Sequence, residues 1–283
     1  MTVRQALSSQ RTLLGSGEYC SADPRLLDAL DIERGGQIRI RRSDEEYAVY
    51  TVHEVREEAR PEIVRVGELG RERLGTSGTF DGTASTPVPR SDISDNAAER
   101  DSEFVERLRD SGENQVVVSA PHGGWIERHT DRQAEYVADR LAGTTAWRCK
   151  GWQDGGGAFD RWHVSSTDLH PDSFPLLGSI ADRGFQYSVS FHGFSGDGVV
   201  IGGDAREPLK QAVRTAIDHA LPDRIDVRLA TGGSYGGDSP ANLVNWLAAE
   251  GRGGIQIEAG FAARVDHWQP IADAVISVLE PRL

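Results

Sequence analysis

The chain has 283 residues, of which 38% are hydrophobic, so it can build the core of one large or two ordinary globular domains. Its formal net charge of −13 argues against a nucleic-acid partner for the second domain described below, because binding to a phosphate backbone depends mainly on Lys and Arg. No apolar stretch is long enough to cross a bilayer, and the first residues lack the apolar core of a signal peptide. We therefore expect no membrane partner and a cytoplasmic location. Cys20 and Cys149 have no disulfide or zinc-knuckle spacing.

Residues 1–82 are predicted to form a small β-rich, barrel-like domain. Asp23-Pro24 opens a short helical pattern, and strand-like segments follow at 37–41, 47–52 and 62–66, separated by Gly-Gly and charged turns. Residues 83–101 contain two prolines and many Ser, Asp and Asn, with almost no periodic apolar pattern, which is typical of a linker. The sequence does not indicate what the first domain binds.

Residues 102–283 alternate between predicted strands and helices. The predicted strands are 115–120, 144–149, 161–165, 185–192, 198–201, 225–230 and 254–258. The predicted helices are 103–110, 130–143, 172–183, 206–220, 240–249 and 268–280. Such alternation predicts an α/β fold with a mixed, mostly parallel sheet that carries helices on both faces. In sheets of this kind ligands bind at the carboxyl ends of the strands.

Three ionisable residues each stand at the carboxyl end of a predicted strand. His122 follows the run of valines at 116–118, His192 ends FQYSVSFH, and Glu258 ends GIQIE. Each is followed by small residues, which let a backbone or a ligand approach closely. Although any one of them could be an ordinary polar strand end, their convergence would form an active-site crevice.

Glu127 lies five residues after His122, across a Gly-Gly loop that can fold the two side chains back onto one point. His122, Glu127 and His192 then form a set of three ligands for one Zn²⁺ per chain, with the fourth position left for water. Water bound to zinc is a nucleophile near neutral pH, and Glu258 would carry its proton to a leaving nitrogen. The predicted chemistry is the hydrolysis of an amide bond.

Two further histidines lie in the same part of the sequence. His129 could replace a metal ligand, but it opens a helix and is more readily explained as a neighbour of the site or a surface residue. His163, in RWHVSST, could polarise a substrate oxygen as a catalytic residue or serve as a hydrogen-bonded structural histidine.

Five motifs together resemble those of the poly-γ-glutamate hydrolases of phages and bacteria, a branch similar to zinc carboxypeptidases. They are PHGGWIE, RWHVSST, SFHGFSGDGVVIGGD, SPANLVNW and GIQIEAG, and they span about residues 115–264. The resemblance implies a zinc carboxypeptidase-like fold, zinc held by His122, Glu127 and His192, and Glu258 as general base and acid. It also implies a γ-glutamyl amide or peptide substrate.

The substrate-binding prediction follows from that resemblance and from charge. A polyanionic substrate needs a local arginine patch on this acidic chain, and we expect Arg161, Arg206 and Arg264 to contribute to it. Asn242, in SPANLVNW, is a further substrate-binding candidate. The chain departs from the family pattern at residues 128–130, where a Gly-Thr pair is usual, and at Trp246, where an arginine is usual.

Two other functions remain open at this point. The second domain could be an inactive relative, with the first domain contacting a protein or DNA in a binding or regulatory role. Alternatively, a zinc enzyme of the same fold could deacylate small N-acyl compounds.

Overall fold

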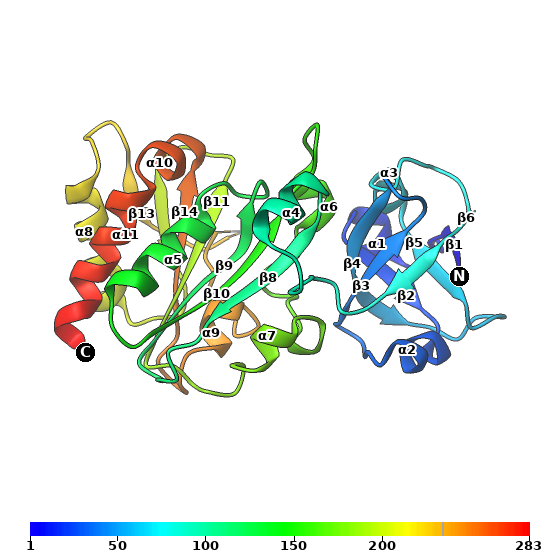
Figure 1. Cartoon of the computed structure of the whole chain (residues 1–283), viewed down its shortest axis with the longest axis horizontal. Coiled ribbons are helices and arrows are strands. Elements are labelled where there is room, and N and C mark those ends of the chain that lie inside the picture. The colour runs from blue at the N-terminus through cyan, green and yellow to red at the C-terminus, as the bar shows by residue number, and fades with distance from the viewer. Residues whose placement is uncertain (234) are drawn as a thin grey trace.

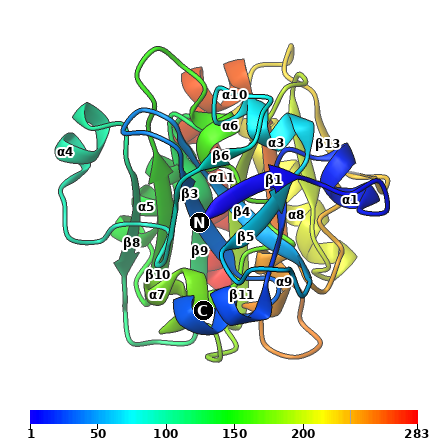
Figure 2. The same ribbon diagram turned by 90° about the vertical axis from the view of Figure 1, so that its right-hand side faces the viewer.

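The computed structural model describes residues 1–233 and 235–283, and it forms two units that each contain a seven-stranded sheet (Figure 1). The strand order is β6-β1-β5-β2-β4-β3-β7 in the first sheet and β13-β12-β14-β11-β9-β10-β8 in the second. The first sheet stands in front of the second when the molecule is viewed from its N-terminal side (Figure 2). A β-rich unit therefore precedes an α/β unit, as predicted.

The first unit encloses its own apolar core, which includes Val3, Ile38, Tyr50 and Val64. Its strands are β1 (Thr2–Gln5), β2 (Tyr19–Ala22), β3 (Gln37–Arg41), β4 (Tyr47–Val55), β5 (Ile63–Val66), β6 (Phe80–Asp81) and β7 (Thr83–Ser85). Its helices are α1 (Arg11–Gly15), α2 (Pro24–Leu30) and α3 (Glu68–Glu72). The predicted strands β3, β4 and β5 and the helix opening at Asp23-Pro24 are confirmed. Asp23 caps α2 by accepting a hydrogen bond from the backbone N–H of Arg25.

The predicted linker, residues 83–101, contains regular structure near both of its ends. Strand β7 pairs with β3 at the edge of the first sheet, and helix α4 (Asp95–Arg100) packs near β8 and β10 of the second. The sequence pattern missed both elements because they are only three and six residues long.

The second sheet is mixed and mostly parallel, in agreement with the prediction. Strands β10, β9, β11 and β14 run parallel to one another, whereas β8 is antiparallel to β10 and β12 is antiparallel to β14. The strands are β8 (Phe104–Arg109), β9 (Val116–Gly124), β10 (Thr144–Gly151), β11 (Tyr187–Phe194), β12 (Val199–Gly202), β13 (Val227–Leu229) and β14 (Ile255–Gly260). The central strands are buried on both faces, as expected for a sheet that is covered on both sides.

Helices cover both faces of this sheet. One face packs on α5 (Thr130–Arg140), α8 (Glu207–Ala220) and α11 (Trp268–Leu279), and one continuous core joins them to it. The other face packs on α6 (Ala158–Trp162), α7 (Pro175–Gly178) and α9 (Leu243–Trp246). Tyr47 and Val49 of β4 belong to that second core, so the first unit helps to cover the second sheet. Helix α10 (Phe261–Asp266) and the 3-10 turns η1 (Pro171–Ser173) and η2 (Glu280–Arg282) complete the unit.

Four element predictions in the second unit were wrong in type or length. Residues 103–110 form strand β8 rather than a helix, because pairing with β10 and burial of Phe104 and Val105 outweigh local propensity. Residues 161–165 are the end of α6 and a loop rather than a strand. The predicted helix 172–183 is replaced by the two short helices η1 and α7, which begin at Pro171 and Pro175. The predicted helix 240–249 is shortened to α9.

The two units are joined by buried polar contacts as well as by the shared core. The Arg39 guanidinium forms an ion pair with Glu103 at 2.9 Å, with both side chains almost fully buried. The Tyr19 hydroxyl donates to Asp168 at 2.7 Å, and the Gln37 side chain donates to the Asp168 carbonyl oxygen at 2.6 Å. The ion pair holds the first unit to the start of β8, and the two Asp168 contacts hold it to the segment between β10 and β11. No helix among the described residues combines the length and apolar character needed to cross a membrane.

Candidate active site

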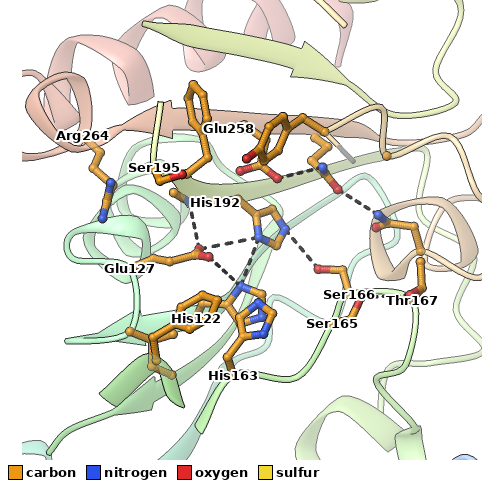
Figure 3. Close-up of a pocket in the computed structure, with 18 of the residues that line it drawn as sticks. His122, Glu127, His163, Ser165, Ser166, Thr167, His192, Ser195, Glu258 and Arg264 are labelled. Carbon is orange, nitrogen blue, oxygen red and sulfur yellow. Dashed lines mark hydrogen bonds and ion pairs between the residues drawn. The ribbon is translucent and has the colours of Figure 1, made fainter. Parts of the chain in front are cut away.

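The carboxyl ends of three neighbouring parallel strands bring His122, His192 and Glu258 to one edge of the second sheet. His122 lies on β9, His192 on β11 and Glu258 on β14, and His192 stands opposite Glu258 in the β11–β14 register. All three side chains line a cavity of about 810 Å³ (Figure 3). The predicted convergence at the strand ends is therefore found in the structure.

The tight turn after β9 carries Glu127 back toward His122. The Glu127 N–H donates to the His122 carbonyl oxygen at 2.7 Å, and the Glu127 carboxylate accepts from the Gly193 N–H at 2.8 Å. Gly124 has φ of +70°, and a Cβ there would lie 2.7 Å from the carbonyl oxygen of Gly151. Gly124, the second glycine of PHGGWIE, is required because only glycine fits this close contact with Gly151.

Two imidazoles and one carboxylate converge at this point. His122 Nδ1 lies 3.2 Å from Glu127 Oε1, His192 Nδ1 lies 3.7 Å from Glu127 Oε2, and the two Nδ1 atoms are 3.3 Å apart (Figure 3). All three side chains are buried. The predicted metal ligands thus lie within one side chain's reach of one another.

The outer ring nitrogens of both histidines are held by neighbouring groups. His122 Nε2 donates to the carbonyl oxygen of Val164 at 2.8 Å, which leaves a lone pair on Nδ1 of the neutral ring. His192 Nε2 lies 2.7 Å from Ser190 Oγ and 3.4 Å from Ser166 Oγ. Two buried nitrogens that face each other at 3.3 Å need a proton or a cation between them. Two imidazole nitrogens and a carboxylate, each oriented by a hydrogen bond to a neighbouring group, are a donor set that suits zinc.

Burial and mutual charge shift the pKa values of the ionisable residues at this site. Burial alone would raise the pKa of Glu127, but the charge and hydrogen bonds of His122 and His192 hold it well below its usual range. Burial lowers the pKa of His192; it would also lower that of His122, where the Glu127 carboxylate outweighs it and raises the pKa. Burial and the negative charge of Glu127 raise the pKa of Glu258 to about 8. A carboxyl group with a strongly raised pKa in a cleft is a candidate for proton transfer.

A chain of side-chain amides holds Glu258 in place. Gln256 donates to Glu258 Oε1 at 2.9 Å, and Asn242 donates to Gln256 Oε1 at 2.8 Å. The Asn242 side chain also caps α9 by accepting from the Val244 N–H. Asn242 lines the cavity as predicted for a substrate-binding residue, but its polar atoms are already used in orienting Glu258 through Gln256.

His163 lies beside the cluster, whereas His129 lies outside the cavity. A ring nitrogen of His163 is within 4.8 Å of ligand atoms of His122 and Glu127, so it could be considered as a third ligand. Its Nδ1, however, is 2.6 Å from Glu18 Oε1, while His192 directs Nδ1 at the other two ligands. This geometry favours His192 over His163 as the third of a set of possible ligands. The His129 ring packs near Trp268 instead.

Only one of the three predicted substrate-binding arginines reaches the cavity. Arg264, on α10, lines it, is 8% exposed, and has a buried Nε without a hydrogen-bond partner among the described residues. Arg161 lies over the ring of Tyr47 at the contact between the units and donates to the carbonyl oxygen of Glu45. Arg206 is exposed and lines a different pocket at the amino ends of β11 and β14.

Sequence reasoning missed several residues that hold the site. Ser190 lies two residues before His192, so strand periodicity alone places it on the same face and could have identified it. Ser166 and Glu18 carry no comparable signal, because loops and the fold of another unit bring them to the histidines.

Comparison with known proteins identifies the family to which this arrangement belongs. Residues 92–271 match the poly-gamma-glutamate hydrolase family over more than half of the chain. The chain belongs to this family. Its place in a family of hydrolases confirms the resemblance that the five motifs indicate, and the match extends beyond residues 115–264 at both ends.

Several solved structures resemble this chain. The zinc-free form of YNDL shares 20% identity at a TM-score of 0.52, covering 63% of this chain and 90% of that one. A bacteriophage poly-gamma-glutamate hydrolase shares 21% identity at a TM-score of 0.48, covering 62% and 87%. A metallo-carboxypeptidase from Pseudomonas aeruginosa shares 14% identity at a TM-score of 0.41, covering 99% and 88%. The match to YNDL shows that this chain shares its fold with that protein. No curated protein matches the chain.

Proposed function

We propose that this poly-gamma-glutamate hydrolase family member cleaves γ-glutamyl amide bonds with one zinc ion held by His122, Glu127 and His192. The observation that carries the proposal is the approach of two histidine Nδ1 atoms to 3.3 Å beside the Glu127 carboxylate, at the edge of a cavity that Glu258 also lines. A set of three protein ligands that leaves one position open is typical of catalytic rather than structural zinc.

Zinc and Glu258 would perform different parts of the hydrolysis. When bound, zinc polarises the scissile carbonyl group and lowers the pKa of a coordinated water to about 7. In this proposal Glu258 accepts the proton of the attacking water and then donates it to the leaving nitrogen. A raised pKa near neutrality suits both steps, because the group must bind the proton and release it in turn. Positive charge bound beside Glu258 would lower that pKa.

Arg264 is the residue that supports an anionic group of the substrate. It is the single arginine that lines the cavity among the described residues, and its Nε lacks a protein partner. A buried guanidinium with a free N–H is suited to the substrate carboxylate next to the cleaved bond or to the developing oxyanion. The side chain also packs against Phe261, with the guanidinium 5.2 Å from the ring centroid.

The charge around the cavity also favours a second candidate function. Glu127, Glu258 and Asp238 line the cavity, whereas Arg264 provides one full positive charge. One arginine recognises one carboxylate, so the cavity also suits a small N-acyl amino acid, and the deacylase alternative is kept for this reason.

Metal analysis and a substrate panel test these proposals together. Protein purified without chelator should contain one zinc per chain and should release product from γ-glutamyl oligomers faster than from α-linked peptides or N-acyl amino acids. Zinc-free protein that gains no activity on adding zinc would overturn the metal assignment. Faster cleavage of N-acyl amino acids would favour the deacylase. A zinc-loaded protein that turns over none of the panel would favour a binding or regulatory role.

A further inference from the structure

A carboxylate from the first unit reaches the edge of the candidate active site. Glu18 lies just before β2, and its Oε1 is 2.6 Å from Nδ1 of His163, which is 145 residues further along the chain. Both side chains are largely buried, with 27% of Glu18 and 17% of His163 exposed. The contact ties the first unit to a histidine whose ring packs against that of His122.

The His163 ring is held between two other rings. Its centroid lies 4.3 Å from that of His122 and 4.2 Å from that of Phe159, with which it stacks at an angle of 20°. His163 lines the cavity, and within residues 1–233 and 235–283 its Nε2 has no hydrogen-bond partner. The ring is thus fixed on its faces and at Nδ1, and Nε2 is the atom left to contact a substrate.

The loop that carries Glu18 is itself anchored to both units. Arg73 donates to the carbonyl oxygens of Gly17 at 2.7 Å and Val49 at 2.9 Å, and it also contacts the carbonyl oxygens of Asp160 and Arg161. A partly buried guanidinium that bridges four backbone oxygens positions this loop against the segment that carries His163. The Glu18 contact is therefore part of an extended interface between the two units rather than an isolated ion pair on the surface.

The chemistry of the pair determines which His163 nitrogen carries the proton. An ionised carboxylate only accepts hydrogen bonds, so Nδ1 of His163 must be the donor to Glu18. In the neutral ring Nε2 then keeps its lone pair and accepts a hydrogen bond. In this state Nε2 can accept a hydrogen bond from a substrate N–H but cannot donate one to a substrate oxygen, the role that the sequence analysis predicts.

We propose that Glu18 is a positioning residue of the active site, which holds the His163 imidazole so that Nε2 accepts a hydrogen bond from the substrate's amide N–H. The first unit then supports a residue of the cavity wall, His163, without lining the cavity itself. The proposal rests on the proposed function, since it assigns a role in amide hydrolysis. It differs from the view of the first unit as a separate binding module, which leaves catalysis independent of Glu18.

Substitutions in the full chain test this role. E18A should lower kcat/KM by about 10- to 100-fold with zinc content unchanged, which is the usual size of such second-layer effects. E18Q should retain more activity than E18A, because its amide oxygen still accepts from Nδ1. Two controls should stay near wild type: E72Q removes a carboxylate from the same groove, and Y19F removes a hydrogen bond between the units without touching His163.

The protonation of His163 gives a second readout that needs no turnover. Nitrogen-15 NMR of histidine-labelled protein should show the Nδ1-protonated ring in the wild type and in E72Q, and a changed His163 signal in E18A. A wild-type ring protonated at Nε2, wild-type kcat/KM in folded E18A, or loss of zinc from E18A would each overturn the proposal. If the wild type cleaves no γ-glutamyl substrate, the proposed function fails, and the NMR result alone then decides whether Glu18 positions His163.

Discussion

The two ends of the second sheet offer two polar concavities that differ in how their charged groups are held. At the carboxyl ends of β9, β11 and β14, two histidines and two glutamates lie buried around a cavity of about 810 Å³. At the amino ends of β11 and β14, Arg206, Arg252 and Arg282 line a pocket of about 580 Å³ together with Glu250, and all four are exposed.

The difference shows that the arrangement of charged residues, rather than their number, distinguishes a candidate active site. Buried groups at 3.2 to 3.7 Å from one another shift each other's pKa values and leave donors aimed at a common point. Exposed arginines are solvated individually and gain little from their neighbours. The sequence analysis placed Arg206 and Arg264 in one patch, but the sheet separates them to opposite ends.

Among substitutions at the two ends of the sheet, removing a metal ligand should have the largest effect on zinc binding and turnover. Glu127→Ala should abolish zinc binding and turnover, because it removes one of three ligands and leaves the two histidines without their anionic partner. In the wild type, zinc at 100 times its Kd should add about 2.7 kcal/mol to the free energy of unfolding, and this increment should vanish in the variant. Metal analysis and thermal unfolding with and without zinc measure both. A variant that keeps a stoichiometric zinc would contradict the ligand assignment.

Glu258→Gln should have the next largest effect on turnover, and this variant should still bind zinc. Loss of the proton carrier should lower kcat by about 100- to 10,000-fold, the usual contribution of a general acid-base group. Glu250→Gln is the matched control, since it makes the same chemical change at the opposite end of the sheet and should leave kcat unchanged. Steady-state kinetics with metal analysis distinguish the two. Equal activity in both variants would remove Glu258 from the mechanism.

The smallest and most discriminating effect should come from a matched pair of arginine variants. Arg264→Gln should lower kcat/KM by about 10- to 100-fold, because a hydrogen bond to a charged group contributes about 1.5–3 kcal/mol. Arg206→Gln should leave kcat/KM unchanged, although both arginines carry the same charge. Measuring both at two salt concentrations separates contact from long-range attraction. A loss in Arg206→Gln would show that the amino-end pocket takes part in substrate binding.

Much of the second unit was predictable because its signals are local and periodic. Runs such as the valines at 116–118 are apolar enough to indicate buried strands, and helices α8 and α11 follow a clear amphipathic period. Segments whose structure depends on a neighbour were not predictable in this way. Strand β8 is helical in pattern but becomes an edge strand because β10 offers hydrogen bonds and burial for Phe104 and Val105.

The sequence by itself determined the chemical set of the candidate site: His122, Glu127, His192 and Glu258. It could do so because parallel strands present their carboxyl ends at a common edge, so polar residues at those ends converge whatever their separation along the chain. Only the tertiary structure decided which other groups join them. Glu18 meets His163 across 145 residues, and Arg264 rather than Arg206 faces the cavity. Loop paths and the packing of one unit on another set those contacts, and neither leaves a periodic pattern in the sequence.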